Sequence, residues 1–152
     1  MAVLKIIKAG DPVLKGKAKP VAHITKHTKK LLDDMAETMY AAEGVGLAAP
    51  QINESLQLVV LDDGSGLIEL INPEIIEHSD DMEEGTEGCL SVPGYYGSVS
   101  RYHAIKVRAL NRRGKTVIYN AEGFLARIFQ HELDHLVGTL FIEKADNLQK
   151  VD

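Results

Sequence analysis

The sequence predicts an α+β fold for a single domain, and three observations lead to this prediction. An amphipathic helix pattern near the N-terminus is followed by several short β-branched segments, and a second helix pattern lies near the C-terminus. Helices and strands do not alternate along the chain as they would in a parallel α/β sheet. A length of 152 residues fits one hydrophobic core better than two, so we expect residues 1–152 to form one domain.

The first expected helix runs from about Thr25 to Glu43. Its apolar residues recur at helical spacing: Leu31, Leu32, Met35, Met39 and Ala42. Thr25 or Thr28 is suited to cap its start, because a hydroxyl oxygen accepts a hydrogen bond from a backbone N–H of the first turn. Gly44 is expected to end the helix, since glycine readily adopts the left-handed conformation that often follows one.

Two strands are expected after this helix, over residues 56–61 and 67–71. The first ends at the turn sequence Asp-Asp-Gly-Ser-Gly, and the second ends at an Asn-Pro pair. The acidic stretch at residues 80–84 is expected to be an exposed loop. Further along, strands over residues 104–110 and 116–119 are expected to form a hairpin around the turn Asn-Arg-Arg-Gly.

The composition excludes several classes of protein. With 45% hydrophobic and 26% charged residues, the chain resembles a folded protein rather than a disordered one. Its apolar runs are far shorter than the roughly 18 residues that cross a membrane, and the N-terminus lacks a signal-peptide layout, so we expect a cytoplasmic protein without a membrane partner. The net charge of −5 argues against direct nucleic-acid binding. The single cysteine, Cys89, excludes a disulfide framework and a four-cysteine zinc site.

The last expected helix runs from about Gly123 to Leu136 and contains the segment His-Glu-Leu-Asp-His. His131 and His135 are four residues apart and therefore lie on one helix face, where both imidazoles can reach one cation. Glu132 is turned by about 100° from His131, so it flanks the site, where a general base for an activated water belongs. The alternative is a pair of structural histidines that share this spacing by chance.

Two histidines are too few for a catalytic metal site of the zinc type, which usually has three protein ligands. No third histidine follows His135, and Glu143 is the only later glutamate, just beyond the expected helix end. The third ligand is therefore expected upstream, and Cys89 is the best candidate because a thiolate is a good partner for two imidazoles. A small buried hydrophobic residue is the alternative for Cys89. Asp134 is a candidate to orient a ligand histidine, or else an exposed helical residue.

The segment from Gly44 to Gln51 consists mostly of small residues between glycine and proline. It lacks the third glycine and the preceding strand of a dinucleotide-binding loop, so that interpretation is rejected. Small residues allow a substrate or a second backbone to approach closely. Gln51 offers an uncharged amide donor suited to an oxyanion. Taken alone, the segment is equally well explained as a helix terminator and a turn.

Three segments together resemble the signature motifs of the peptide deformylase family: Gly44-Val45-Gly46-Leu47-Ala48-Ala49-Pro50-Gln51, Glu87-Gly88-Cys89-Leu90-Ser91 and Gln130-His131-Glu132-Leu133-Asp134-His135. Their order and separation also fit, and the resemblance extends from Asp11 to Phe141. It implies antiparallel sheets packed around the C-terminal helix that carries the metal-binding motif. It also implies hydrolysis of the N-formyl group from the formyl-methionine terminus of new polypeptides, with release of formate.

The resemblance implies a role for each matching position. Three residues would hold the metal: Cys89, His131 and His135. The general acid and base would be Glu132. Two groups would stabilise the oxyanion: the Gln51 side chain and the Leu90 backbone N–H. Two residues would contact the substrate backbone: Val45 and Gly46. The ion implied by the resemblance is Fe(II), although cysteine and histidine ligands suit Zn(II) or another divalent ion as well.

The last helix also suggests how the substrate side chain is bound. Phe124, Arg127 and Ile128 precede His131 by seven, four and three residues and therefore share its helix face. Phe124 and Ile128, with Val45 and the aliphatic stem of Arg127, are expected to form an apolar slot for a long flexible side chain such as that of methionine. Ordinary core packing is the alternative.

Two rival functions remain at this stage: a general metalloprotease with the His-Glu-x-x-His motif, and a non-catalytic metal-binding module. The absence of a third downstream ligand argues against the first, and the absence of a suitable fourth ligand argues against the second. The expected partners are N-formyl-methionyl nascent peptides and, transiently, the ribosome. Some members contact the ribosome through a longer C-terminal helix. The segment after Phe141 is short, so the resemblance does not imply that particular contact here.

Overall fold

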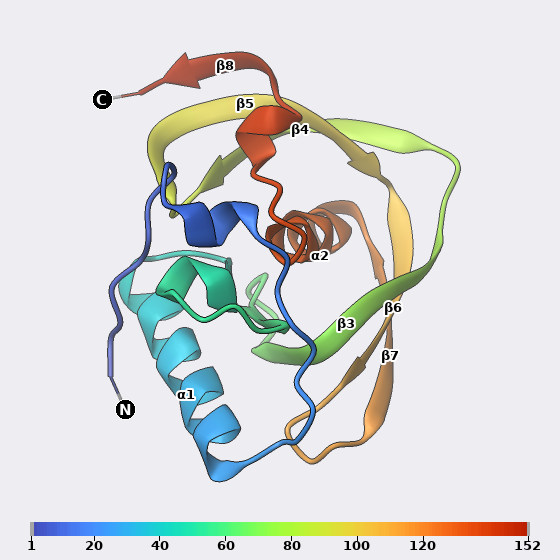
Figure 1. The fold of residues 1–152 in the computed structure, drawn as a ribbon. Coiled ribbons are helices and arrows are strands. Elements are labelled where there is room, and N and C mark those ends of the chain that lie inside the picture. The colour runs from blue at the N-terminus through green and yellow to red at the C-terminus, as the bar shows by residue number, and fades with distance from the viewer. Residues whose placement is uncertain (1, 152) are drawn as a thin grey trace.

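Two antiparallel sheets enclose the C-terminal helix, as a computed structural model of residues 2–151 shows (Figure 1). Met1 and Asp152, the ends of the expected domain, lie outside the described residues. The larger sheet has the strand order β1-β2-β3-β6-β7, and the smaller sheet has the order β4-β5-β8. The α+β class predicted from the sequence is therefore confirmed.

The elements have the following bounds. The strands of the larger sheet are β1 (Gly46–Ala48), β2 (Leu58–Leu61), β3 (Ile68–His78), β6 (Ala104–Leu110) and β7 (Thr116–Glu122). Those of the smaller sheet are β4 (Met82–Cys89), β5 (Val92–Tyr102) and β8 (Asp146–Lys150). The α-helices are α1 (Lys26–Ala41) and α2 (Gly123–His135), and the short 3₁₀ helices are η1 (Pro12–Lys15), η2 (Ala49–Ile52) and η3 (Phe141–Glu143).

Helix α1 begins as predicted but ends differently. Thr25 caps it, and Thr28 completes a reciprocal capping box. At the other end Glu43, not Gly44, adopts the left-handed conformation (φ 57°), and the N–H of Gly44 reaches back to the carbonyl of Met39 at 2.9 Å. Gly44 packs closely against Leu90, since a Cβ atom there would lie 2.7 Å from a methyl carbon of Leu90 and that side chain would have to move.

Strand β3 continues beyond the point at which the sequence predicted its end. The register with β6 shifts between Ile71 and Glu74, and Asn72 within the irregularity has a positive φ of 53°. The Asn72 side chain exchanges two hydrogen bonds with the backbone of Val21, at 2.8 and 3.0 Å. The Asn-Pro pair therefore forms a bulge rather than a strand end, because a contact distant in sequence holds it and the bulge tolerates the missing N–H of Pro73.

The expected acidic loop at residues 80–84 is also corrected, since Met82, Glu83 and Glu84 begin β4 and pair with β5. This strand has no alternation of apolar and polar residues that would reveal it, and it forms because β5 supplies a continuous register from Met82 opposite Tyr102 to Glu87 opposite Gly97. The segment after η3 likewise forms β8 on the outer edge of β5.

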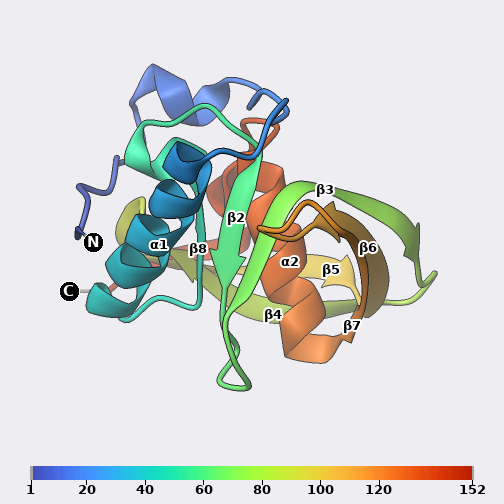
Figure 2. The same cartoon turned by 90° about the horizontal axis from the view of Figure 1, so that it is seen from below.

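Helix α2 lies between the two sheets, as Figure 2 shows from below. Ala126 and Phe129 on one side belong to the same core cluster as Val59, Leu70 and Val107 of the larger sheet. His131 contacts Glu87 of the smaller sheet. The fold thus anchors α2 on one sheet while it directs the motif histidines toward the other. None of the helices within residues 2–151 has the length and apolar character needed to cross a membrane.

Candidate metal centre and active site

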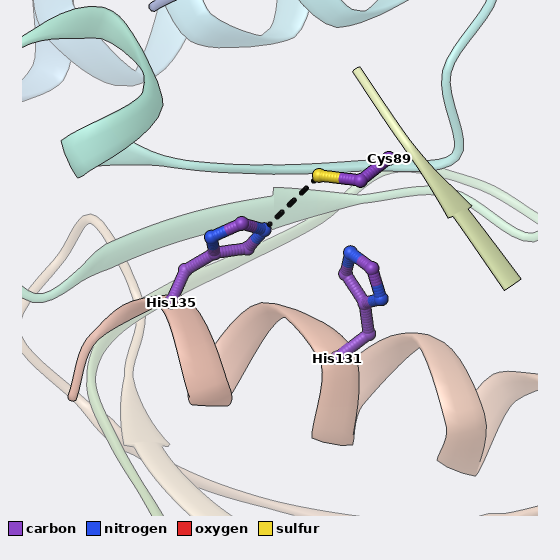
Figure 3. A group of neighbouring side chains, drawn as sticks. All are labelled: Cys89, His131 and His135. Carbon is purple, nitrogen blue, oxygen red and sulfur yellow. Dashed lines mark hydrogen bonds between the residues drawn. The ribbon is translucent and has the colours of Figure 1, made fainter. Parts of the chain in front are cut away.

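Cys89 lies beside the two motif histidines. Cys89 is the last residue of β4, whereas His131 and His135 lie one turn apart on α2 (Figure 3). The ligand atoms of these three residues lie within 4.8 Å of one another, and the Cys89 Sγ–His135 Nε2 distance is 3.4 Å. No other group of three His, Cys, Asp or Glu residues within the described part of the chain meets this criterion. The structure thus brings the upstream cysteine next to the two motif histidines.

The chemistry of these three donors fits a single divalent ion. Four-coordinate sites with metal–sulfur bonds near 2.3 Å and metal–nitrogen bonds near 2.0 Å place a sulfur and a nitrogen ligand atom about 3.5 Å apart. The 3.4 Å between Cys89 Sγ and His135 Nε2 matches this spacing. His135 is 1% exposed, and its Nε2 is the ring nitrogen that faces Cys89 Sγ, whereas its Nδ1 has no hydrogen-bond partner among the described residues. Three protein donors leave a position for water or substrate.

Glu87 orients His131 and is a residue that the sequence interpretation missed. Its Oε1 lies 2.9 Å from His131 Nδ1, which leaves Nε2 for the metal. Burial alone would raise the pKa of Glu87, but hydrogen bonds from Arg101 and His131 outweigh burial and lower the pKa to about 2. The ionised carboxylate then keeps the proton of His131 on Nδ1. Asp134, the candidate from the sequence, instead accepts a hydrogen bond from Arg101 at 2.6 Å.

The sequence offered no pattern that pointed to Glu87, because β4 was not predicted as a strand. In the structure Glu87 lies two residues before Cys89 in β4, although the register with β5 shifts between them. The carboxylate is also shared with two arginines: Arg101 donates from Nε and Nη2 at 2.9 and 2.8 Å, and Arg127 donates from Nη1 at 2.6 Å. The guanidinium of Arg127 therefore holds the Glu87 carboxylate, whereas the sequence interpretation gave a role only to the aliphatic stem of Arg127.

Glu132 occupies the position expected of a general base. It is 4% exposed, its Oε1 has no hydrogen-bond partner among residues 2–151, and it lines the same cleft as Cys89 and His131. Burial raises the pKa of Glu132 to about 7. A Cβ atom at Gly46 would lie 2.5 Å from Glu132 Oε2, so a residue without a side chain is required there. A carboxyl group with a pKa near neutrality is suited to both accept and return a proton.

Gln51 is held in one amide orientation by two hydrogen bonds. Its Oε1 accepts from the N–H of Ala48 at 3.0 Å, and its Nε2 donates to Ser91 Oγ at 3.1 Å. Nε2 also lies 3.6 Å from Cys89 Sγ, so the amide nitrogen faces the metal ligands. Leu90 follows Cys89 in the turn between β4 and β5 and lines the same cleft. Ser91, which is 0% exposed, was not singled out from the sequence.

A cleft of about 410 Å³ joins these residues to the expected substrate positions. All five of those positions line it: Val45, Gly46, Phe124, Arg127 and Ile128. Val45 and Phe124 are 43% and 57% exposed, respectively, whereas Ile128 is 3% exposed and lies deeper. The cleft is also lined by Pro93, Tyr95 and Tyr96 of β5, which the sequence interpretation did not include because it did not predict that strand.

Comparison with known proteins identifies relatives over nearly the whole chain. The family model described as polypeptide deformylase matches residues 3–151. The chain is 59% identical over 148 residues to the peptide deformylase of Carboxydothermus hydrogenoformans, covering 97% of each chain. It is 62% identical over 148 residues to that of Halothermothrix orenii, covering 95% of this chain and 94% of the relative.

Solved structures show the same architecture. The crystal structure of peptide deformylase from Thermotoga maritima has a TM-score of 0.93 at 45% identity, covering 95% of this chain and 98% of the other. A peptide deformylase from Synechococcus elongatus in complex with actinonin has a TM-score of 0.92 at 41% identity, covering 95% of this chain and 79% of the other. The similarity thus includes both sheets and the helix that carries the metal-ligand candidates.

Proposed function

This chain belongs to the polypeptide deformylase family, and from that membership we propose which role each of its active-site residues has in the reaction. The activity is that of a metallo-hydrolase that removes the N-formyl group from nascent peptides. The observation that supports our assignment of residues most strongly is the convergence of Cys89, His131 and His135 beside the buried, unpartnered carboxyl of Glu132. We further propose that residues 1–152 work as one catalytic domain.

In this proposal the metal ion is held by Cys89, His131 and His135. Glu87 fixes the orientation of His131 through the hydrogen bond to its Nδ1. We propose Fe(II) as the resident ion, although the same donors suit Zn(II). When bound, the ion acts as a Lewis acid that makes water nucleophilic at neutral pH. Metal analysis of protein purified without oxygen, compared with protein purified in air, tests the choice of ion. Zinc at full occupancy in the anaerobic preparation, with full activity, would contradict Fe(II).

Glu132 accepts a proton from the attacking water and returns one to the leaving amine. Its unpartnered Oε1 and its pKa of about 7 support both transfers. Gln51 Nε2 and the backbone N–H of Leu90 donate to the oxyanion that develops on the formyl oxygen. The two hydrogen bonds that orient the Gln51 amide keep its nitrogen, rather than its oxygen, directed at that charge.

Val45 and Gly46 contact the substrate backbone, and the cleft beyond them receives the methionine side chain. Ile128 provides a buried apolar wall, whereas Phe124 and Val45 lie exposed at the mouth and become covered when the peptide binds. Arg127 contributes its aliphatic stem to the wall, because its guanidinium is held by Glu87 and by the carbonyls of Val99 and Glu83.

Replacing Arg127 with methionine separates the contribution of its aliphatic stem to the cleft wall from the contribution of its guanidinium to the position of Glu87. We expect KM for a formyl-methionyl peptide to stay within about twofold, because an unbranched apolar side chain remains. The metal dissociation constant is expected to rise by up to about tenfold, the lower end of the range for loss of a direct partner of a metal ligand, because Glu87 loses one of its donors. Competition with a chromogenic chelator measures the metal dissociation constant. Arg108→Met, which removes only the exposed pair with Glu74, is the matched control and should leave both quantities unchanged.

Formate release tests the function as a whole. Metal-loaded protein is expected to release formate from a formyl-methionyl tripeptide and to leave the internal bonds of an unformylated peptide intact. Cleavage of the internal peptide without formate would indicate a general metalloprotease. Metal binding without either activity would indicate a non-catalytic module.

We also propose that the protein acts in the cytoplasm and associates transiently with the ribosome, because its substrates are nascent peptides. Residues 146–150 pair with β5 as β8, so a ribosome contact would not use a helix at this position. Co-sedimentation with ribosomes at low and high salt tests this association, and absence of the protein from the ribosome pellet at low salt would contradict it.

A further inference from the structure

Residues 7–9 near the N-terminus, which we term the N-terminal strap, connect two parts of the proposed active site. The N–H of Ile7 donates to the carbonyl of Gln51 at 2.6 Å, and the N–H of Ala9 donates to the carbonyl of Ser91 at 2.8 Å. Lys8 Nζ lies 3.5 Å from the carbonyl of Leu90. The N-terminal segment rises beside α1 and reaches the turn between β4 and β5 (Figure 1). It therefore contacts, in three consecutive residues, the two segments assigned to oxyanion binding.

These two segments belong to different sheets. Gln51 lies in η2, directly after β1 of the larger sheet, whereas Leu90 lies in the turn between two strands of the smaller sheet. The Gln51 side chain joins them through Ser91 Oγ. The strap adds a connection through backbone groups, which do not depend on a side-chain rotamer. Both backbone acceptors belong to buried residues, since Gln51 is 1% exposed and Ser91 is 0% exposed.

The strap is itself held in place at both ends. Before it, the N–H of Leu4 donates to Thr38 Oγ1 of α1 at 2.8 Å. After it, the N–H of Asp11 donates to the carbonyl of Lys8 at 3.3 Å and closes a turn. The extended segment is therefore fixed to α1 and to its own turn, and its two N–H groups approach the active-site segments from a defined position.

We propose that the N-terminal strap is a positioning element that sets the separation between the Gln51 amide and the Leu90 N–H. The proposal rests on the oxyanion roles assigned above. Preorganised donors of this kind must be held within about 0.5 Å of the productive geometry, and a misplacement of about 1 Å can lower the rate by about 10²-fold. The strap touches no reacting atom, and it acts through the backbones of Gln51, Leu90 and Ser91.

Ala9→Pro removes one of these hydrogen bonds, and because the proline ring takes the place of the N–H, it moves the strap away from the carbonyl of Ser91. Ala9 is exposed and occupies the second position of the turn from Lys8 to Asp11. Gly10, at the third position, has a φ of 104°, as in a type II turn, and proline is favoured at the second position of such a turn. The variant therefore keeps the turn and loses the N–H that binds Ser91. Ala9→Ser keeps the N–H and is the matched control.

Kinetics on metal-loaded enzyme with a formyl-methionyl tripeptide test the proposal. We expect Ala9→Pro to lower kcat by about tenfold with KM and metal content unchanged, and Ala9→Ser to match the parent. Tm is expected to fall by several degrees in Ala9→Pro, because the buried carbonyl of Ser91 loses its donor, but to stay well above the assay temperature. A kcat within twofold of the parent, or a kcat loss that follows a loss of metal or of folded protein at the assay temperature, would overturn the proposal. If Ala9→Pro does not fold, Lys8→Met replaces it, with a two- to threefold loss of kcat expected and an unchanged kcat overturning the proposal.

Gln51→Ala separates a failure of the strap from a failure of the oxyanion assignment. It is expected to lower kcat by about 10²–10³-fold. If Gln51→Ala keeps full kcat, the oxyanion assignment is wrong and the strap proposal falls with it. If Gln51→Ala loses kcat and Ala9→Pro does not, only the strap proposal is wrong. In the Gln51→Ala background, Ala9→Pro is expected to lower kcat further by clearly less than tenfold, because one of the two positioned donors is already missing. A full tenfold further loss there would indicate a merely structural role and would overturn the strap proposal.

Discussion

Replacing Glu132 with alanine is expected to lower kcat by about 10²–10⁴-fold while the bound metal is retained. The reason is that Glu132 is not among the three converging donors, yet it lines the same cleft and has a buried carboxyl oxygen without a hydrogen-bond partner among residues 2–151. Removal of the carboxyl leaves the ligand set intact and eliminates the group that we assign to proton transfer. Formate release under saturating substrate, together with metal analysis of the same sample, measures both quantities.

Glu132→Gln is the matched variant, because it keeps the size and shape of the side chain and removes only its ability to take up a proton. Its kcat is expected to fall as far as that of the alanine variant, while its Tm stays at the parent value. A variant that still released formate at close to the parent rate would show that another group carries the proton. Loss of metal in Glu132→Gln would instead show that the carboxylate contributes to the metal site.

The second large effect is expected for Cys89→Ser, which should lose most of its bound metal. A hydroxyl has a much higher pKa than a thiol and is a poor donor to a soft or borderline ion, so one of three protein ligands is effectively removed. Activity is expected to fall with metal content rather than independently of it. Equilibrium dialysis against a defined concentration of Fe(II) or Zn(II), followed by metal analysis, measures retention.

His78→Ala provides the control for that experiment. His78 stacks on Tyr102 with ring centroids 3.8 Å apart and lies outside the group formed by Cys89 and the motif histidines. Its removal should leave metal retention unchanged. If Cys89→Ser retained metal as well as His78→Ala does, the thiol would be only a packing residue, as in the alternative considered for it from the sequence.

Local sequence patterns were sufficient for the helices and for the most regular hairpin. Helix α1 follows from its apolar spacing and its threonine cap, and β6 was predicted with its observed bounds, from Ala104 to Leu110. Helix α2 carries both motif histidines on one face because residues four apart on a helix always do. These predictions depend on interactions within a few residues, which the local pattern contains.

Strands β4 and β8 could not be predicted in the same way. The residues of β4 are mostly charged or glycine, and those of β8 are all exposed, so neither strand has an apolar face with a period of two. Both form because β5 offers free backbone donors and acceptors on each of its edges. Strand β5 was not predicted either, and its omission left Tyr95 and Tyr96 out of the predicted cleft.

The sequence by itself determined the chemistry of this protein: two histidines on one helix face, a glutamate beside them, and one cysteine as the remaining candidate donor. Only the tertiary structure decided how those groups are oriented. Glu87 contacts His131 across 44 residues of chain, and Gln51 contacts Ser91 across 40. Such contacts depend on strand register and on how two sheets pack around one helix, and neither is contained in the local spacing of residues.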